Sequence, residues 1–172
     1  MKLSYLYEIV LFVLLILLQV LLLNRIGLFG IATPVLYLYF LLKLPMGKNL
    51  FYVIISGFLM GLIVDVFLNT PGMNAAATTI VAAFRKPVMN LFFQKEEYDE
   101  FVPGIYTATG PFIRFTILMV LMHLTLLFFI ESFTLFNLMS TLLRIASSSF
   151  ISILLIFALD SFIFKRKRGE QV

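Results

Sequence analysis

Long apolar runs separated by short polar breaks are the main pattern along the chain. Charged residues, prolines and glycines delimit six such runs, at residues 3–23, 28–44, 50–68, 73–93, 112–130 and 142–164. A helix needs about 20 apolar residues to cross a hydrocarbon core of about 30 Å. The pattern therefore predicts an all-α, polytopic integral membrane protein with about six transmembrane helices, built as a single domain over residues 1–172.

The six runs differ in regularity. The first is too long for the apolar part of a signal peptide and no small-residue cleavage site follows it, so we interpret it as a retained membrane helix. The second is shortened by Pro34 near its start and closed by Lys43 and Pro45, because proline is tolerated at a helix start and ends a helix further along. The fourth contains Arg85-Lys86-Pro87, where we expect a kink.

The distribution of positive charge predicts the orientation. Short loops rich in Lys and Arg remain in the cytoplasm. Placing both termini inside puts eleven of the thirteen cations on the cytoplasmic side and leaves two outside, Arg25 and Arg144. An odd number of spans would separate the basic tail at 165–168 from Lys2, so six spans with cytoplasmic N and C termini are preferred.

Composition restricts the class further. Hydrophobic residues make up 62% of the chain and charged residues 13%, and the mean hydropathy is +1.06. This leaves too little polar surface for a soluble domain beside the membrane helices. Cysteine is absent, which excludes disulfides, thiolate metal sites and cysteine catalysis.

Asp65 is a carboxylate in an apolar run that otherwise contains no charge from Leu50 to Leu68, in the stretch GLIVDVFLNTPGMNA at 61–75. Gly57, Gly61 and Asp65 are four residues apart, which places them on one face of a helix. Such small-residue faces let another helix approach closely in lipid, and the next run opens with small residues. We therefore predict a tight helical hairpin that turns at Gly72, with Asn74 or Asn69 capping a helix end.

Asp65 is expected near the outer end of its helix, at the depth of the only two outer cations. A carboxylate in apolar surroundings needs a partner. The candidate ion pairs are Asp65 with Arg144, which we favour because a helix holds it at fixed depth, and Asp65 with Arg25. The alternatives are a hydrogen-bonded or solvated helix-end residue, a direct contact with a partner protein, and a proton or cation relay.

The pattern GFLMGLIVDVFLNTPGMNAAATT at 57–79 resembles the rod shape-determining protein MreD family of the bacterial cell-elongation machinery. A glycine-rich span that ends in Asp, a short turn with Gly, and then Asn and small residues carry the resemblance. It implies a scaffold in the inner membrane that binds MreC and, within a larger complex, RodA, a penicillin-binding transpeptidase and MreB. It implies no catalytic residue and no cofactor.

The outer loops are the expected contact surface for MreC. The loops at 24–30 and 131–139 are short and carry Phe29, Phe133 and Phe136. Apolar groups exposed beyond the bilayer need a cover. We therefore predict that these three side chains touch the partner.

Other chemistry has little support in the sequence. His123 is the only histidine, so we expect it to pack or to form a hydrogen bond between helices rather than bind a metal. The serines of the last run lack a base at a readable spacing and are expected to hydrogen-bond between helices. An enzyme is therefore disfavoured, as is nucleic-acid binding.

A substrate-binding membrane subunit, like those of energy-coupling-factor importers, has similar size and remains the alternative function.

Overall fold

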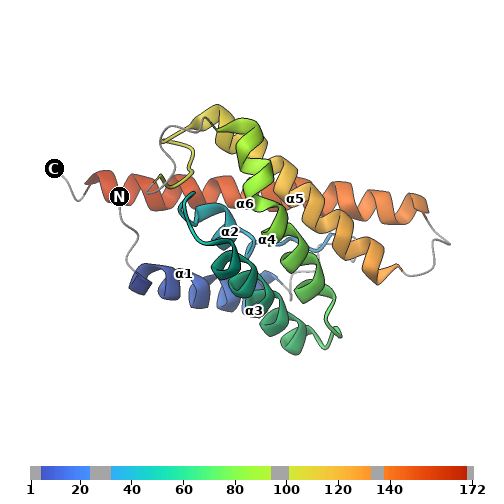
Figure 1. Cartoon of the computed structure of the whole chain (residues 1–172). Coiled ribbons are helices and arrows are strands. Elements are labelled where there is room, and N and C mark those ends of the chain that lie inside the picture. The colour runs from blue at the N-terminus through green and yellow to red at the C-terminus, as the bar shows by residue number, and fades with distance from the viewer. Residues whose placement is uncertain (1–4, 24–31, 94–100, 133–137, 170–172) are drawn as a thin grey trace.

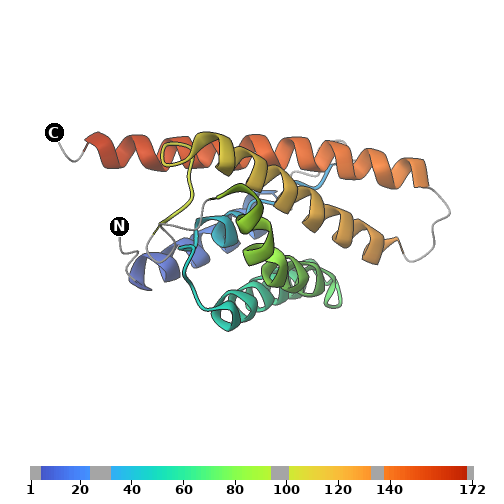
Figure 2. The same cartoon turned by 45° about the horizontal axis from the view of Figure 1, so that its top comes forward.

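The computed structural model of the chain describes residues 5–23, 32–93, 101–132 and 138–169, with only the backbone described for 164–169. The described residues form an all-helical bundle, in which the longest helix lies along one side of the others (Figures 1 and 2). The all-α class predicted from the sequence is confirmed.

Within the described ranges, four helices are long and apolar enough to cross a membrane. They are α1 (Tyr5–Leu18) continued by the π-helical turn η1 (Gln19–Leu23), α3 (Leu50–Leu68), α5 (Thr109–Glu131) and α6 (Leu138–Gly169, of which Leu138–Ile163 is the apolar part). They coincide with the first, third, fifth and sixth apolar runs. The fold is that of a multi-pass helical membrane protein.

The fourth run forms α4 (Met73–Phe92), which is less apolar than these four. It packs between α3 and α5 (Figure 1), and Asn74, Thr78 and Arg85 are buried in the bundle. The helix continues through Pro87 to Phe92. These three polar residues face protein rather than lipid, whereas Lys86 and Asn90 are exposed. The buried polar residues explain why α4 has the composition least typical of a membrane span.

The second run does not form the helix that we predicted over 28–44. Residues 32–38 are not helical, and α2 (Tyr39–Lys43) is only five residues long; residues 28–31 lie outside the described part. Pro34 disfavours helical backbone at the residue before it, and Pro45 follows directly on the end of α2. We call residues 32–46 the broken segment.

The broken segment lies at the centre of the core. The side chains of Tyr37, Leu38, Tyr39, Leu41 and Leu42 are fully buried. By contrast, α1 and α3 expose many large apolar side chains, as expected for helices that face lipid. Non-helical backbone at membrane depth is tolerated only where protein or a water-filled cavity surrounds it, and here the long helices provide that enclosure.

The helix ends gather at two ends of the molecule (Figures 1 and 2). The start of α1 and the end of α6 lie at one end, which we call the tail end. The α3–α4 turn, the end of α5 and the start of α6 lie at the opposite end, which we call the turn end. Successive elements therefore run in alternating directions between the tail end and the turn end. This alternation is expected of helices that cross a membrane one after another.

Candidate functional site

The stretch around Asp65 forms the junction of the α3–α4 hairpin. Asp65 is 3% exposed, and its carboxylate accepts hydrogen bonds from the backbone N–H groups of Asn74 (3.0 Å) and Ala75 (2.8 Å). The Asn74 side-chain amide (2.9 Å) and the Thr70 hydroxyl (2.6 Å) also donate to it. Asp65 therefore caps the N-terminus of α4 from the preceding helix, where the helix dipole favours a negative charge.

The turn itself uses two residues in the left-handed region. Asn69 (φ 55°) ends α3, and its N–H bonds the Asp65 carbonyl. Gly72 (φ 76°) precedes α4 at the N-cap position, where a side chain would be strained. The predicted turn at Gly72 and the predicted cap at Asn69 are confirmed, whereas Asn74 lies inside the first turn of α4 and donates to Asp65 instead of capping a helix.

The glycines of α3 bring the two helix backbones together. A Cβ on Gly61 would lie 2.6 Å from the Cα of Ala75 and 2.6 Å from the Asn74 carbonyl oxygen. A Cβ on Gly57 would lie 2.9 Å from the Cβ of Ala82. The close approach predicted from the spacing of Gly57, Gly61 and Asp65 is confirmed.

The ion pair predicted between Asp65 and Arg144 is wrong. The Nη2 of Arg144 lies 3.0 Å from Glu131 instead, while N–H and O–H groups of the hairpin surround Asp65. The local backbone donors at the start of α4 satisfy the carboxylate, so it needs no cation. Arg25, the other candidate, lies outside the described residues.

Side chains from two helices hold the broken segment. The Gln19 amide donates to the Pro34 carbonyl (3.0 Å) and accepts from the Leu36 N–H (2.8 Å). On the other side, Ser148 accepts from the Thr33 N–H (3.0 Å) and Ser152 from the Val35 N–H (2.8 Å). These bonds replace the sheet or helix partners that buried backbone requires. Ser148 and Ser152 of α6 thus bind backbone of the broken segment, not another helix.

A polar cluster connects the broken segment to the hairpin and to α5. The Tyr37 hydroxyl donates to the Asn74 amide oxygen (3.1 Å) and lies 3.0 Å from Nε2 of His123 and 3.4 Å from the Thr78 hydroxyl. His123 is fully buried. The expected packing and hydrogen bonding of His123 are confirmed, with a partner in the broken segment.

Arg85 satisfies the free carbonyl groups at the end of α2. It is 2% exposed, and it donates from Nε to Leu41 (2.6 Å), from Nη1 to Pro45 (3.5 Å), and from Nη2 to Leu44. A guanidinium at a helix C-terminus bonds the last carbonyls and matches the helix dipole. The carbonyl groups at the end of the short helix α2 therefore explain why α4 carries the buried charge of Arg85.

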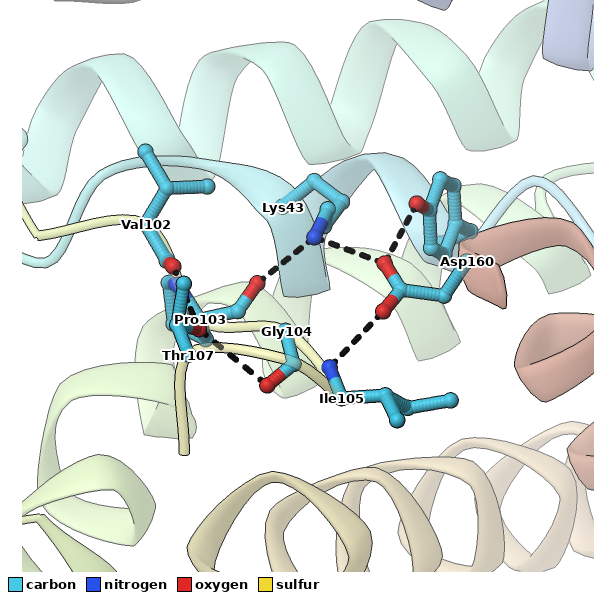
Figure 3. Close-up of polar contacts among 8 residues, drawn as sticks. Lys43, Val102, Pro103, Gly104, Ile105, Thr107 and Asp160 are labelled. Carbon is cyan, nitrogen blue, oxygen red and sulfur yellow. Dashed lines mark hydrogen bonds and ion pairs between the residues drawn. The ribbon is translucent and has the colours of Figure 1, made fainter. Parts of the chain in front are cut away.

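A second buried charge cluster lies at the tail end (Figure 3). Lys43 Nζ lies 2.6 Å from the Asp160 carboxylate and donates to the Pro103 carbonyl (2.8 Å). Asp160 also accepts from the Tyr39 hydroxyl (2.7 Å) and the Ile105 N–H (2.8 Å). This Lys43–Asp160 cluster joins α2, α6 and the connection before α5. The sequence pattern marks Lys43 as the end of the second run and as a cytoplasmic cation, and it gives no sign of the pairing with Asp160.

A pocket of about 200 Å³ opens at the turn end. Its lining comes from η1, the broken segment, the α3–α4 hairpin, the end of α5 and the start of α6; it includes Gln19, Tyr37, Asn74, Glu131 and Arg144. Mostly apolar walls with a few polar groups are typical of small-molecule sites.

The described residues contain no group of three or more His, Asp or Glu side chains placed to hold a metal ion. Phe29, Phe133 and Phe136, the predicted contacts for a partner, lie outside the described part of the chain. The functional candidates are therefore the α3–α4 hairpin, the broken segment with its polar supports, and the pocket.

Sequence reasoning missed the supports of the broken segment. Gln19 and Asp160 are polar residues within apolar runs, and both are buried. An intramembrane ionisable or polar residue is a signal for a site, and that signal was applied only to Asp65. Pro34 within the second run and Pro45 directly after it were the corresponding signal for the break.

Searches of protein-family models, of curated proteins and of solved structures found no match for this chain.

Proposed function

We propose that the protein is a non-enzymatic scaffold of the MreD type, located in the bacterial cytoplasmic membrane, that binds MreC within the cell-elongation machinery. RodA, a penicillin-binding transpeptidase and MreB would be reached through the same complex. The proposal starts from the sequence pattern at 57–79, and the geometry of the hairpin supports it.

The hairpin is the observation that carries the proposal. The glycine, Asp and Asn residues that carry the resemblance all have roles inside the α3–α4 junction. Gly57 and Gly61 allow the two helix backbones to approach closely, and Gly72 makes the turn. Asp65 caps α4 through Asn74. These contacts hold α3 and α4 together as a closely packed pair of helices. Such a motif suits a protein whose function is to present a fixed surface to partners.

Six crossings with cytoplasmic termini are part of the proposal. Besides the four long apolar helices, α4 and the broken segment also run between the turn end and the tail end (Figures 1 and 2). Among the described residues outside the basic tail, five cations lie in or beside the half of an element that is nearer the tail end, and Arg144 lies toward the turn end. The five are Lys43, Lys48, Arg85, Lys86 and Arg114. This bias supports a cytoplasmic tail end.

The contact with MreC is proposed at the outer loops and within the bilayer. Phe29, Phe133 and Phe136 are the loop residues to test. Replacing all three with alanine is expected to weaken co-purification with MreC at an unchanged level of the protein in the membrane. Unaltered co-purification would remove these loops from the interface.

The alternative function is a substrate-binding membrane subunit of an importer. The pocket at the turn end is the observation that favours it, because its polar and charged lining lies within a bundle of membrane helices. Discontinuous helices line substrate sites in many transporters, and the broken segment contributes Thr33, Pro34, Val35 and Tyr37 to this lining.

Affinity purification of native complexes distinguishes the two functions. The tagged chain is purified from its own membranes under mild solubilisation, and the co-purifying proteins are identified by mass spectrometry. The scaffold function predicts MreC and cell-wall synthases. Recovery of an ATPase module without these proteins would support the importer and contradict the scaffold.

A further inference from the structure

The pocket at the turn end has the size and lining of a site for a small molecule. An apolar cavity of about 150 Å³ accommodates benzene, so the volume of about 200 Å³ admits a ligand of roughly ten non-hydrogen atoms. Apolar side chains line most of it, among them Val64, Leu68 and Leu127. The lining therefore suits a small molecule with an apolar body.

The two side-chain amides of the lining, those of Gln19 and Asn74, already have partners in the protein. The Gln19 amide bonds the backbone of the broken segment on both of its polar atoms. The Asn74 amide bonds Asp65 and the Tyr37 hydroxyl. These groups fix the shape of the pocket wall. Recognition of charged groups on a ligand therefore depends on Glu131 and Arg144.

Glu131 and Arg144 form an ion pair that leaves much of their bonding capacity unused. Both carboxylate oxygens of Glu131 accept from the same nitrogen of Arg144, Nη2, at 3.0 and 3.2 Å. Within the described part of the chain, the Nε and Nη1 donors of Arg144 have no acceptor. A guanidinium presents five N–H donors, so most remain available to a ligand.

The two charged groups are also accessible and positioned. The side chains of Arg144 and Glu131 are 29% and 41% exposed. The guanidinium carbon lies 4.5 Å from the centre of the Phe128 ring, a contact that stabilises the cation and orients its plane. The pocket therefore ends in one fixed positive group and one negative group side by side.

We propose that this pocket binds a small zwitterion that carries an anionic group, a primary ammonium group and an apolar body. The anionic group accepts hydrogen bonds from Nε and Nη1 of Arg144, and the ammonium group donates to Glu131. The apolar body lies against Val64, Leu68 and Leu127. A free amino acid and the headgroup of phosphatidylethanolamine both have this chemistry. The inference does not depend on whether the chain is a scaffold or an importer subunit.

The test uses the full chain in nanodiscs of phosphatidylglycerol, with L-leucine as the free zwitterion. Binding of radiolabelled L-leucine is measured for the wild type and for Arg144→Gln and Glu131→Gln. Lys86→Gln is the matched control, because Lys86 is an exposed cation on α4 outside the pocket lining. Retention of phosphatidylethanolamine over phosphatidylglycerol is measured by native mass spectrometry in mixed nanodiscs for the same four proteins.

We expect saturable binding of one of the two probes, weakened about tenfold or more by either pocket variant, as removal of a charged hydrogen-bonding partner predicts. Lys86→Gln should bind like the wild type. Leucine binding identifies a free zwitterion and selective lipid retention identifies a headgroup. Thermal unfolding establishes that each variant is folded. Absence of both kinds of binding, or binding that both pocket variants leave unchanged, would overturn the proposal.

Discussion

The carboxylate of Asp65 on α3 accepts both the backbone N–H (3.0 Å) and the side-chain amide N–H (2.9 Å) of Asn74, at the start of α4. This relationship joins the two helices at their turn and supplies the cap that Gly72, without a side chain, cannot provide. The carboxylate therefore has a structural role that can be tested apart from any partner.

Replacing Asp65 with alanine should destabilise the protein by roughly 2–4 kcal/mol, because it removes a helix cap and leaves buried N–H groups without acceptors. Asp65→Asn keeps one acceptor oxygen and should be intermediate. Reversible unfolding of the purified chain in detergent, followed by circular dichroism, measures both variants. Equal stability of Asp65→Ala and the wild type would mean that solvent replaces the cap.

Asp65 and Arg144 should not be coupled energetically. The structure pairs Arg144 with Glu131 and gives Asp65 separate partners, and changes at sites with no shared partner add within about 0.5 kcal/mol. The double variant Asp65→Ala with Arg144→Ala should therefore lose the sum of the two single losses. A larger departure from additivity would indicate that the two side chains interact, which would contradict the structure.

Replacing Gly61 with alanine should destabilise the hairpin by about 1–3 kcal/mol, the usual cost of overpacking. The added methyl group would meet α4 backbone at 2.6 Å, and backbone cannot move aside as a side chain can. Gly110→Ala on α5 is the control, since nothing lies within 4 Å of its added Cβ and alanine favours a helix. The prediction fails if both variants have the same unfolding midpoint.

The Lys43–Asp160 pair should show strong coupling. The two side chains are 8% and 0% exposed, and removing one partner of a buried pair typically costs about 3–5 kcal/mol. Lys43→Met and Asp160→Asn should each destabilise, and the double variant should lose less than the sum. The exposed Glu131–Arg144 pair is the comparison, for which coupling of about 0–1 kcal/mol is expected. Similar coupling in the two pairs would show that burial does not strengthen the inner one.

Two single cysteines should label from opposite sides of the membrane. Pro71 lies in the turn between α3 and α4 and Tyr106 in the connection before α5, and both are exposed. The chain has no cysteine of its own, so Pro71→Cys and Tyr106→Cys carry no background. A membrane-impermeant maleimide added to intact cells should react with Cys at 71 only. Reaction at both positions would contradict the proposed orientation.

The sequence was sufficient for the elements that depend on local patterns. Hydropathy located the four long helices, and the four-residue spacing of Gly57, Gly61 and Asp65 located the hairpin, because these signals act within one turn or one helix. The broken segment depends on contacts distant in sequence. Ser152 bonds Val35 across 117 positions, and Tyr39 bonds Asp160 across 121. No local pattern encodes such pairs.

The partner of Asp65 was mispredicted for a related reason. Depth in the membrane made Arg144 a candidate, but depth does not fix distance within a bundle. The nearer donors were the free N–H groups that every helix has at its start. The sequence does contain a sign of these partners. Gly72 at the N-cap position has no side chain to cap α4, and a carboxylate lies shortly before it in the chain. Together these two features could have directed the prediction to Asn74 and Ala75.

Reconstitution with MreC tests the proposed function most directly. The chain and full-length MreC from the same organism are co-expressed, purified through a tag on the chain, and analysed by size-exclusion chromatography and native mass spectrometry. Gly110→Ala, which should preserve the fold, is the control for substitution as such. We predict a stable complex of defined mass for the wild type and for Gly110→Ala. A folded, monodisperse chain that elutes without MreC under these conditions would contradict the proposal that this membrane protein is a scaffold for MreC.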